Sequence, residues 1–309
     1  MQPSVLITGG AGFIGSNLAS FLLQKDYEVT VYDNLSTGRL DYLDDLNCRI
    51  ISGDILDSIE LTKAMRGHRI VIHLAAYGSV VESIVDPVTN FDVNARGTLT
   101  TLMAARNTAI EHVIFASTGG ALIGEAEPPV SERSLARPIS PYDASKLVGE
   151  AYLSAFARSY GLHTTALRFA NVFGPLSVHK KGALTNFIKA IMAEQPITIY
   201  GDGSASRDFL YVRDLCRGIE LACRKKSDGF CVFHLASGIE TTIESLVEAI
   251  CGVSGHPDHP IKYLPSRTGE VSRNFATFDL AREQLGFSPS VSLSTGLELT
   301  WQWFLDQNS

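Results

Sequence analysis

Cysteine is scarce in this sequence and follows no pattern typical of metal sites or disulfide frameworks. The 309 residues contain five cysteines, an odd number, and none are paired as Cys-x-x-Cys. They are scattered over the chain as Cys48, Cys216, Cys223, Cys231 and Cys251. This spacing predicts neither a zinc site nor a fold held together by disulfide bonds. We therefore expect reduced thiols in a cytoplasmic protein, with no bound metal.

Excess positive charge and long apolar runs are also missing. The net charge is −7, so there is no electrostatic reason to expect nucleic acid or an anionic membrane as a partner. No apolar run is long enough to span a bilayer, and the N-terminus lacks the pattern of a signal peptide. The length suffices for one large domain or one and a half, with a sizeable core.

A glycine-rich stretch at residues 8–15 follows an apolar run, 5–7, that predicts a buried strand, and it precedes an expected helix. Its glycines are spaced as Gly9, Gly12 and Gly15. A tight glycine turn lets the backbone approach a phosphate closely, and the helix N-terminus offers unpaired N–H groups and a positive dipole end. The stretch therefore predicts a pyrophosphate site for a dinucleotide.

An acid ends the next expected strand. Residues 28–32 form that strand, and Asp33 follows directly. A carboxylate at this point accepts hydrogen bonds from the ribose hydroxyls of adenosine and repels a 2′-phosphate, which favours NAD over NADP. The alternative is a turn or helix-capping role for Asp33. Its position after the glycine stretch favours the cofactor role.

The third and fourth expected strands, at 49–53 and 70–76, end in further cofactor positions. Asp54 is placed to accept from the adenine amino group, with Ile55 flanking the ring, although Asp54 also suits the N-cap of the next helix. The fourth strand runs into small residues that let the backbone pass close to the cofactor. His73, within it, has no neighbouring acid or nucleophile, so we expect a packed side chain.

A long helical pattern then covers residues 86–107, where the polar Asn94 is expected to reach the cofactor region. The fifth strand, at 112–116, ends in Ser117 and Thr118. Hydroxyl groups at the carboxyl end of a parallel strand point toward the ligand crevice.

Tyr142 and Lys146 lie four residues apart, so they share one face of the helix expected at 142–159. An ammonium group near a phenol favours the phenolate, and we therefore expect a lowered pKa for Tyr142. A lowered pKa would make this tyrosine a usable base near neutral pH. Such pairs are common on helix surfaces, but after the preceding motifs this one indicates catalysis.

Together these stretches resemble the extended short-chain dehydrogenase/reductase family, specifically its NAD-dependent nucleotide-sugar epimerases and dehydratases. The sequence is most similar to UDP-glucose (UDP-N-acetylglucosamine) 4-epimerases over essentially its whole length. The stretches that carry the resemblance are TGGAGFIG (8–15), GDILD (53–57), HLAA (73–76), STGGALIG (117–124), YDASK (142–146), LRFANVFGP (167–175), IYGDGSASRDFLYVRDL (199–215) and LPSRTGEV (264–271).

The resemblance implies an α/β fold, a Rossmann doubly wound parallel sheet with a smaller C-terminal α/β substrate-binding domain. It implies an NAD-binding domain at residues 1–170, with a returning segment near 205–240, and a nucleotide-sugar-binding domain at 171–309. Helices 86–107 and 142–159 resemble the dimerising pair of the family, so we expect a homodimer.

The resemblance also implies residue roles, which group by ligand. The implied catalytic residues are Thr118, Tyr142 and Lys146. The implied NAD contacts are Gly9, Gly12, Phe13, Ile14, Asp33, Asn34, Ser36, Thr37, Gly38, Asp54, Ile55, Leu74, Ala75, Ala76, Asn94, Ser117, Tyr142 and Lys146. The implied contacts to the UDP-sugar are Ser79, Glu82, Thr118, Tyr142, Asn171, Arg207, Arg267, Glu270 and Asn274.

Two arginines and an amide suit the diphosphate of such a substrate. Arg207 and Arg267 lie in expected loops, and guanidinium groups make bidentate contacts to phosphate. Asn171 follows an expected strand, and its amide is able to donate to a diphosphate oxygen. Glu270 matches the acid that accepts from the nucleotide ribose in the family.

The residues after Thr118 bear on the reaction type. Dehydratases and decarboxylases of the family carry Asp-Glu or Glu there, whereas this chain has Gly119 and Gly120. Without an acid to protonate a leaving hydroxyl, we expect epimerisation at C4. In that hypothesis Tyr142 takes the proton of the C4 hydroxyl, hydride passes to NAD, and Thr118 or Ser117 hydrogen-bonds the C4 oxygen. The 4-keto sugar then turns about its diphosphate and accepts hydride on its other face.

Two departures from the family pattern bear on the substrate. Ile123 replaces the usual tyrosine, which removes one hydroxyl near the site. Asn274 stands where epimerases restricted to plain hexoses carry a tyrosine, and the smaller side chain indicates room for an N-acetyl group. The alternatives are a nucleotide-sugar dehydratase or reductase, and a non-catalytic NAD(H)-binding sensor. The retained Tyr142 and Lys146 argue against the sensor.

Overall fold

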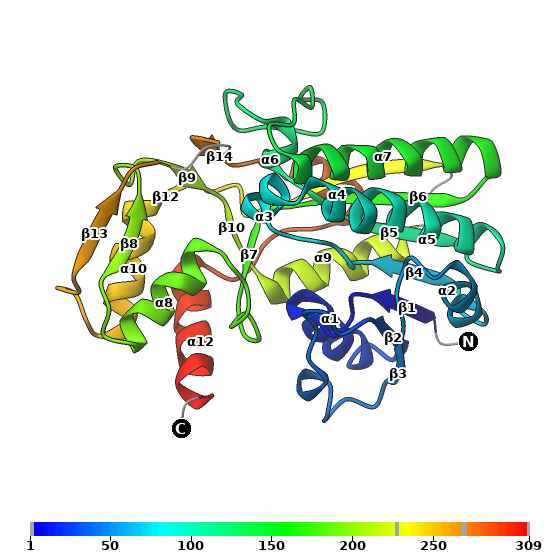
Figure 1. Ribbon diagram of the computed structural model, residues 1–309, viewed down its shortest axis with the longest axis horizontal. Coiled ribbons are helices and arrows are strands. Elements are labelled where there is room, and N and C mark those ends of the chain that lie inside the picture. Colours follow the sequence, from blue (N-terminus) through cyan, green and yellow to red (C-terminus); the bar gives the residue numbers. More distant parts are fainter. Residues whose placement is uncertain (1–2, 226–228, 267–270, 308–309) are drawn as a thin grey trace.

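Seven parallel strands form the central sheet, in the order β11-β6-β5-β4-β1-β2-β3 (Figure 1). The computed structural model describes residues 3–225, 229–266 and 271–307. The strands of the sheet are β1 (Ser4–Thr8), β2 (Glu28–Asp33), β3 (Arg49–Ser52), β4 (Ile70–His73), β5 (His112–Thr118), β6 (His163–Phe169) and β11 (Phe230–Leu235). Because all pairs are parallel, the carboxyl ends of the strands meet at one edge of the sheet.

Helices cover both faces of this sheet. On one face lie α1 (Phe13–Leu23), α9 (Val212–Arg224) and α11 (Asp279–Leu285); on the other lie α2 (Ser58–Met65), α5 (Gly97–Arg106) and α7 (Pro141–Tyr160). The alternation of β1 explains both layers, since Val5 and Ile7 pack toward α1 and α9 while Leu6 packs toward α2 and α5. A strand buried on both faces needs an uninterrupted apolar sequence. The expected doubly wound Rossmann sheet is thus confirmed.

The helical pattern at 86–107 is not one regular α-helix. It consists of α4 (Pro87–Asn90), a π-helical segment η2 (Phe91–Arg96) and α5, in direct succession. π-Helical turns are rare and occur frequently at functional sites. Here the π-helical segment contains Asn94, which is 1% exposed.

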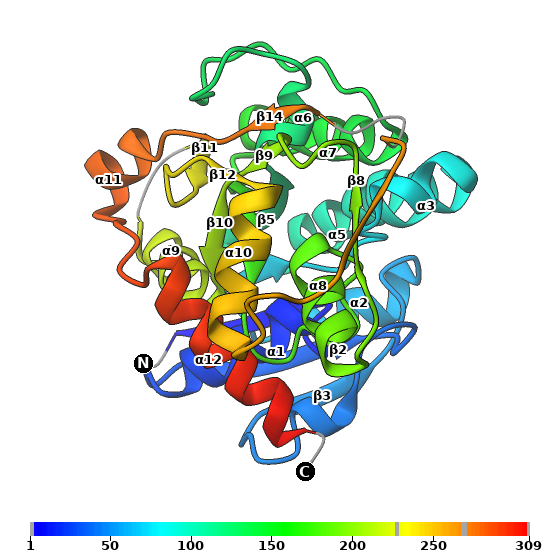
Figure 2. The same ribbon diagram turned by 90° about the vertical axis from the view of Figure 1, so that its left-hand side faces the viewer.

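A second lobe follows β6 and has its own apolar core. Its helices are α8 (Ala183–Met192), α10 (Ile243–Ser254) and α12 (Leu293–Asp306), and its strands are β7 (Asn171–Phe173), β8 (Ile197–Tyr200), β9 (Ser206–Arg207), β10 (Phe209–Tyr211), β12 (Thr241–Thr242), β13 (Ile261–Leu264) and β14 (Arg273–Asn274). Helix α10 packs between α8 and α12 (Figure 2). The remaining short helices are η1 (Leu40–Tyr42), α3 (Val80–Val85) and α6 (Gly120–Ile123).

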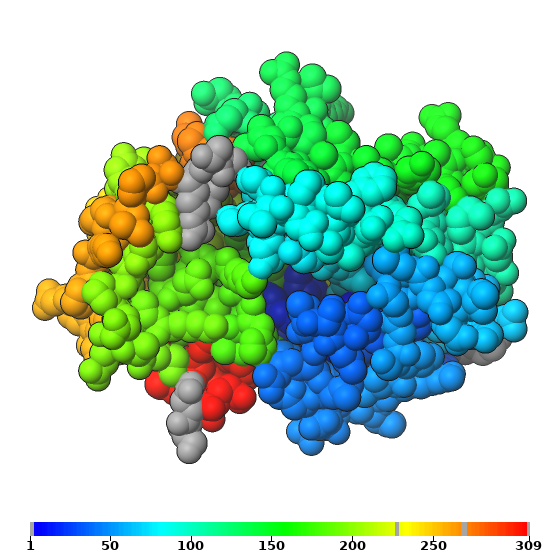
Figure 3. All heavy atoms as spheres, in the orientation of Figure 1, coloured from blue at the N-terminus to red at the C-terminus, as the bar shows by residue number. Residues whose placement is uncertain are grey.

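The chain crosses between the lobes more than once. After β10 it returns through α9 and adds β11 to the sheet beside β6. The space-filling view shows a recess between the lobes, with the dark-blue N-terminal segment at its bottom (Figure 3). In the part of the chain that the structure describes, we find no helix with the length and apolar content to cross a lipid bilayer.

Four buried histidines, His68, His73, His112 and His234, have lowered pKa values, and the three with the largest shifts predict a loss of stability in acid. Burial lowers the pKa of His73 and His234 to about 3 and that of His112 to about 4. In an unfolded chain a histidine takes up its proton near pH 6.5, so below that pH the unfolded state binds more protons and the folded state loses stability. We expect the free energy of unfolding in urea to fall by about 2 kcal/mol for each of these three histidines between pH 7.5 and 5.0.

The substitution His112→Gln tests this assignment, because it removes one of the three groups and leaves the other two. Between pH 7.5 and 5.0, the free energy of unfolding of this variant should fall by about 2 kcal/mol less than that of the wild type. The exposed His256 supplies the control, and His256→Gln should retain the full wild-type loss. An unchanged acid loss in His112→Gln would contradict the prediction.

Candidate active site

The glycine turn brings the start of α1 against the ends of β1 and β4. Gly9 has a φ of +70°, and a Cβ on it would lie 2.6 Å from the Ala75 nitrogen. A Cβ on Gly15 would lie 2.4 Å from the Gly9 carbonyl oxygen. No larger residue fits either position without moving the backbone. The first turn of α1, with Phe13 and Ile14, therefore presents N–H groups without intrahelical acceptors at the strand edge.

Asp33 joins the end of β2 to this turn. Its Oδ2 accepts a hydrogen bond from the Ala11 nitrogen (3.0 Å), and its Oδ1 accepts one from the Leu35 nitrogen (2.8 Å). Gly38 packs directly over it, because a Cβ there would lie 2.8 Å from Oδ1. Each carboxylate oxygen retains a second lone pair for a hydroxyl. The turn role and the cofactor role, which the sequence offers as alternatives, are therefore compatible.

Asp54 lies beside Asn34 at the end of β3, where Asn34 Nδ2 donates to Asp54 Oδ2 (3.0 Å). The helix-capping alternative for Asp54 is wrong, since α2 is capped by Asp57. The flanking position that we expect for Ile55 beside the adenine stays a prediction. Ile55 is 6% exposed and packs against Gly97, where the missing side chain makes room for it. Ser36 and Thr37, which are two further expected contacts to NAD, are exposed.

The segment after β4 is held in place by Asn94. The three partly buried residues Leu74, Ala75 and Ala76 lead to Tyr77, whose backbone nitrogen donates to Asn94 Oδ1 (2.7 Å). Asn94 Nδ2 donates to Ser145 Oγ on α7 (3.0 Å). The amide thus has protein partners on both sides. These contacts connect the segment after β4 to α7. A direct contact of Asn94 to NAD stays a prediction.

His73, at the end of β4, is a packed side chain, as expected. Its Nδ1 contacts Thr8 Oγ1 (2.7 Å) and its Nε2 contacts Thr98 Oγ1 (3.1 Å). Both ring nitrogens are thereby hydrogen-bonded inside the core.

Two of the expected substrate contacts lie on α3. The hydroxyl of Ser79 caps this helix by accepting from the Glu82 nitrogen (3.2 Å). Glu82 forms an ion pair with Lys181 of the second lobe. Both residues therefore stand near the boundary between the lobes, with protein partners of their own.

Ser117 and Thr118 differ in what their side chains contact. Ser117 is 3% exposed and donates to Glu150 Oε1 (2.6 Å), and Glu150 also binds Arg168 through two hydrogen bonds (2.9 and 2.8 Å). Successive side chains of a strand point to opposite faces, so Thr118 points away from Glu150. The buried Glu150 and Arg168 were not anticipated. Glu150 lies on α7, one helical turn after Lys146, whereas its partner Arg168 lies on strand β6, so no local spacing in the sequence indicates the pair.

Tyr142 and Lys146 are brought together as predicted. Helix α7 starts at Pro141 and is capped by Ser140, which accepts from the Asp143 nitrogen (3.2 Å). The Lys146 Nζ lies 5.8 Å from the centre of the Tyr142 ring and donates to the Ala116 carbonyl oxygen (2.8 Å).

The expected lowering of the Tyr142 pKa is not produced by these residues. Burial raises the pKa of the Tyr142 phenol above its ordinary value, with the charge of Asp143 adding to the effect. Burial also lowers the pKa of Lys146 to about 7. The ammonium group is thus costly where it lies, and its hydrogen bond goes to Ala116 instead of the phenol.

Asn274 lies across from the loop that follows Thr118. A Cβ on Gly120 would lie 1.4 Å from Asn274 Oδ1, so the amide fills the space that a side chain at position 120 would need. Ile123 is 1% exposed and belongs to a small apolar cluster with Leu122 and Ala276. The isoleucine in place of the usual tyrosine is therefore packed within this apolar cluster.

The remaining expected substrate contacts lie in the second lobe. Asn171 begins β7, and Arg207 ends β9 and donates from Nη1 to the Ser206 carbonyl oxygen (2.8 Å). Arg267 and Glu270 lie outside the described residues. Within the described ranges, no group of three or more His, Cys, Asp or Glu side chains is placed to hold a metal ion.

Known proteins are similar to this chain in both sequence and fold. A UDP-glucose 4-epimerase of Mycolicibacterium smegmatis is 35% identical over 98% of this chain and 99% of its own. A UDP-glucose 4-epimerase of Thermotoga maritima, solved with UDP-glucose, has a TM-score of 0.94 at 36% identity, covering 99% of this chain and 100% of that one. A UDP-N-acetylglucosamine 4-epimerase of Methanobrevibacter ruminantium, solved with UDP-N-acetylmuramic acid, has a TM-score of 0.93 at 35% identity, covering 99% and 100%.

The family assignment agrees with the geometry of the glycine turn and of Asp33, which fits a dinucleotide. Residues 5–235, from β1 to β11, match the NAD dependent epimerase/dehydratase family. The chain belongs to this family of enzymes, and its cofactor is NAD.

Proposed function

We propose that this enzyme interconverts the C4 epimers of a UDP-sugar through a transient 4-keto sugar, with NAD retained as a bound cofactor. We further propose that it accepts N-acetylated sugars and serves sugar-nucleotide or polysaccharide biosynthesis. The observation that carries the proposal is the contact of Gly120, which follows Gly119, with the amide of Asn274. An elimination needs an acid near the sugar, and position 120 has no space for one while Asn274 lies there.

The roles of the catalytic residues follow from their positions. When bound, oxidised NAD supplies the hydride acceptor and a positive charge at the site. Tyr142 removes and returns the proton of the C4 hydroxyl, and its raised pKa is opposed by that added charge. Lys146 lies within reach of both the phenol and the strand end. Thr118 is the better candidate to hydrogen-bond the C4 oxygen, because the hydroxyl of Ser117 is committed to Glu150.

The second lobe would hold the nucleotide and diphosphate. We propose that Asn171 and Arg207 bind the diphosphate, together with Arg267, and that Glu270 accepts from the ribose of the nucleotide. Residues 1–170 with the returning segment would then bind NAD, and residues 171–309 the UDP-sugar. Such a division allows the diphosphate to be held firmly while the sugar turns.

We also propose a cytoplasmic homodimer formed through η2, α5 and α7. Exposed apolar side chains on these helices support this arrangement. Phe91 is 57% exposed, Met103 38% and Tyr152 40%.

The reaction itself is tested by proton NMR of the purified enzyme with UDP-N-acetylglucosamine and, separately, with UDP-glucose, without added cofactor. We expect conversion to the galacto forms with no net gain in absorbance at 340 nm, since NAD is regenerated in each turnover. Tyr142→Phe should lower the rate by about 10²-fold to 10⁴-fold because the proton acceptor is lost. A 4-keto-6-deoxy product would show a dehydratase and contradict the proposal.

The space around Asn274 gives a second prediction. Gly120→Ala forces the amide of Asn274 out of its position, so kcat/KM for UDP-N-acetylglucosamine should fall by about tenfold or more. The double variant Gly120→Ala with Asn274→Ala removes the clash and should recover part of this loss, since the contact of the amide with the substrate is still missing. Gly252→Ala in α10 is the matched control, because a Cβ there meets no atom within 4 Å. A double variant as impaired as Gly120→Ala alone would show that the clash is not the cause.

A further inference from the structure

Two residues that we propose to hold the substrate lie side by side on neighbouring strands. Strand β14 runs parallel to β9, with Asn274 opposite Arg207 and Arg273 opposite Ser206. Side chains alternate between the two faces of a strand. Arg207 and Asn274 therefore share one face of this ladder, and Ser206 and Arg273 share the other.

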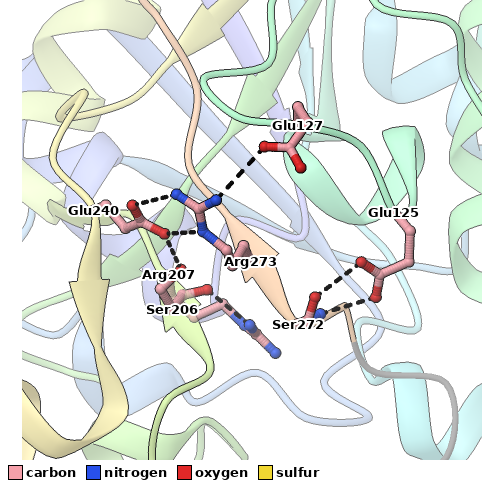
Figure 4. A network of polar contacts seen from close by, with 7 residues as sticks. All are labelled: Glu125, Glu127, Ser206, Arg207, Glu240, Ser272 and Arg273. Atoms are coloured by element: carbon pink, nitrogen blue, oxygen red, sulfur yellow. Dashed lines mark hydrogen bonds and ion pairs between the residues drawn. The ribbon is translucent and has the colours of Figure 1, made fainter.

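The face away from the substrate is bridged by one carboxylate, that of Glu240 (Figure 4). Arg273 donates to it from Nε (2.8 Å) and Nη2 (2.9 Å), in the bidentate geometry that makes such pairs strong. Ser206 Oγ donates to the same carboxylate (2.6 Å). Glu240 directly precedes β12, which pairs antiparallel with β9. A single side chain thus connects all three strands of this small sheet.

Glu240 has the properties of a permanent structural charge. Its hydrogen bonds from Arg273 and Ser206 lower its pKa to about 2. It is therefore ionised throughout the range in which the protein would work. Its side chain is 28% exposed, against 49% for Arg273.

Two further acids approach the same segment and differ from Glu240 in their contacts. Glu125 accepts from the nitrogen and the hydroxyl of Ser272, both at 2.9 Å. Glu127 comes within 3.6 Å of Arg273 Nη1, but its side chain is 95% exposed (Figure 4). Glu127 and Glu240 are thus both negatively charged and both lie near Arg273. Only Glu240 forms a bidentate bond with Arg273 and accepts a hydrogen bond from Ser206.

The ladder needs such support because it is very short. Each of β9 and β14 has two residues, and strands of this length are not stable alone. A backbone hydrogen bond from the Ser206 nitrogen to the Ser272 carbonyl oxygen (2.9 Å) helps to join them. The bidentate bond of Glu240 adds a connection that fixes the relative position of the two strands.

We propose that Glu240 is a positioning residue for substrate binding: by holding Arg273 and Ser206 together, it sets the positions of Arg207 and Asn274 on the opposite face. The identity of the ligand rests on the proposed function. Loosening this connection weakens the hold on the diphosphate and changes selectivity at the sugar, while Tyr142 and Lys146, on α7, keep their geometry.

The test compares Glu240→Gln with the matched control Glu127→Gln in the NAD-loaded enzyme. Both variants remove one negative charge beside Arg273. For Glu240→Gln we expect the Kd for UDP, measured by calorimetry, and the KM for the UDP-sugar to rise about five- to tenfold, with kcat changed less than about twofold. NAD content should be unchanged. Glu127→Gln should behave as the wild type.

A charge exchange, Glu240→Arg with Arg273→Glu, keeps an ion pair between the strands and should restore UDP affinity toward that of the wild type. A single positioning role also predicts that the preference between UDP-glucose and UDP-N-acetylglucosamine shifts in Glu240→Gln. If Glu240→Gln lowers kcat alone, or if Glu127→Gln causes an equal loss of UDP affinity, the inference is wrong.

UDP binding needs no turnover, which separates this inference from the proposed function. A wild-type enzyme that epimerises UDP-sugars while Glu240→Gln matches it in every readout would overturn the inference alone. A wild-type enzyme that binds UDP with the expected sensitivity to Glu240→Gln, but epimerises no UDP-sugar, would overturn the proposed function alone.

Discussion

The close approach of α1 to the ends of β1 and β4 is the constraint on which the site depends. It requires Gly9 and Gly15, because a Cβ at either would overlap backbone atoms. The approach places the start of the helix at the edge where all strands of the sheet end. Asp33 then joins the neighbouring strand to the same turn through the Ala11 nitrogen. The site that we propose for the pyrophosphate is therefore formed by backbone groups, and Asp33 adds a carboxylate beside it.

Tyr142 and Lys146, which we propose as catalytic residues, lie where burial disfavours the charged form of each side chain. The phenol of Tyr142 has a raised pKa and the ammonium of Lys146 a lowered one. Both shifts have the same cause, which is the loss of water around a group that must carry charge to act. In the proposed function, the positive charge of bound NAD would offset part of the cost of the phenolate. Perturbed groups of this kind are typical of active sites.

Much of the fold was predictable from local pattern, because apolar strand runs and glycine or capping signals act over a few residues. The carboxyl-end positions of Asp33 and Thr118 and the pairing of Tyr142 with Lys146 followed from this. Contacts between distant segments could not be predicted in the same way. Ser117 meets Glu150 33 residues later, and Arg273 meets Glu240 across the same separation. Nothing local in the sequence distinguishes these acids from solvated ones.

In the proposed function, the choice between reactions that share this fold depends on the small space between Gly120 and Asn274. The sheet, the glycine turn and the Tyr-Lys pair suit any member of an epimerase/dehydratase family, so they cannot select the chemistry. We propose that Gly120 and Asn274 contribute to this selection, because the amide of Asn274 occupies the space that a side chain on residue 120 would need. These residues are far apart in sequence, and in the sequence each is only an isolated difference from the family pattern. Only the structure shows that the amide of Asn274 occupies the space beside Gly120. In the proposed function, this one contact bears both on the choice of sugar and on the type of reaction.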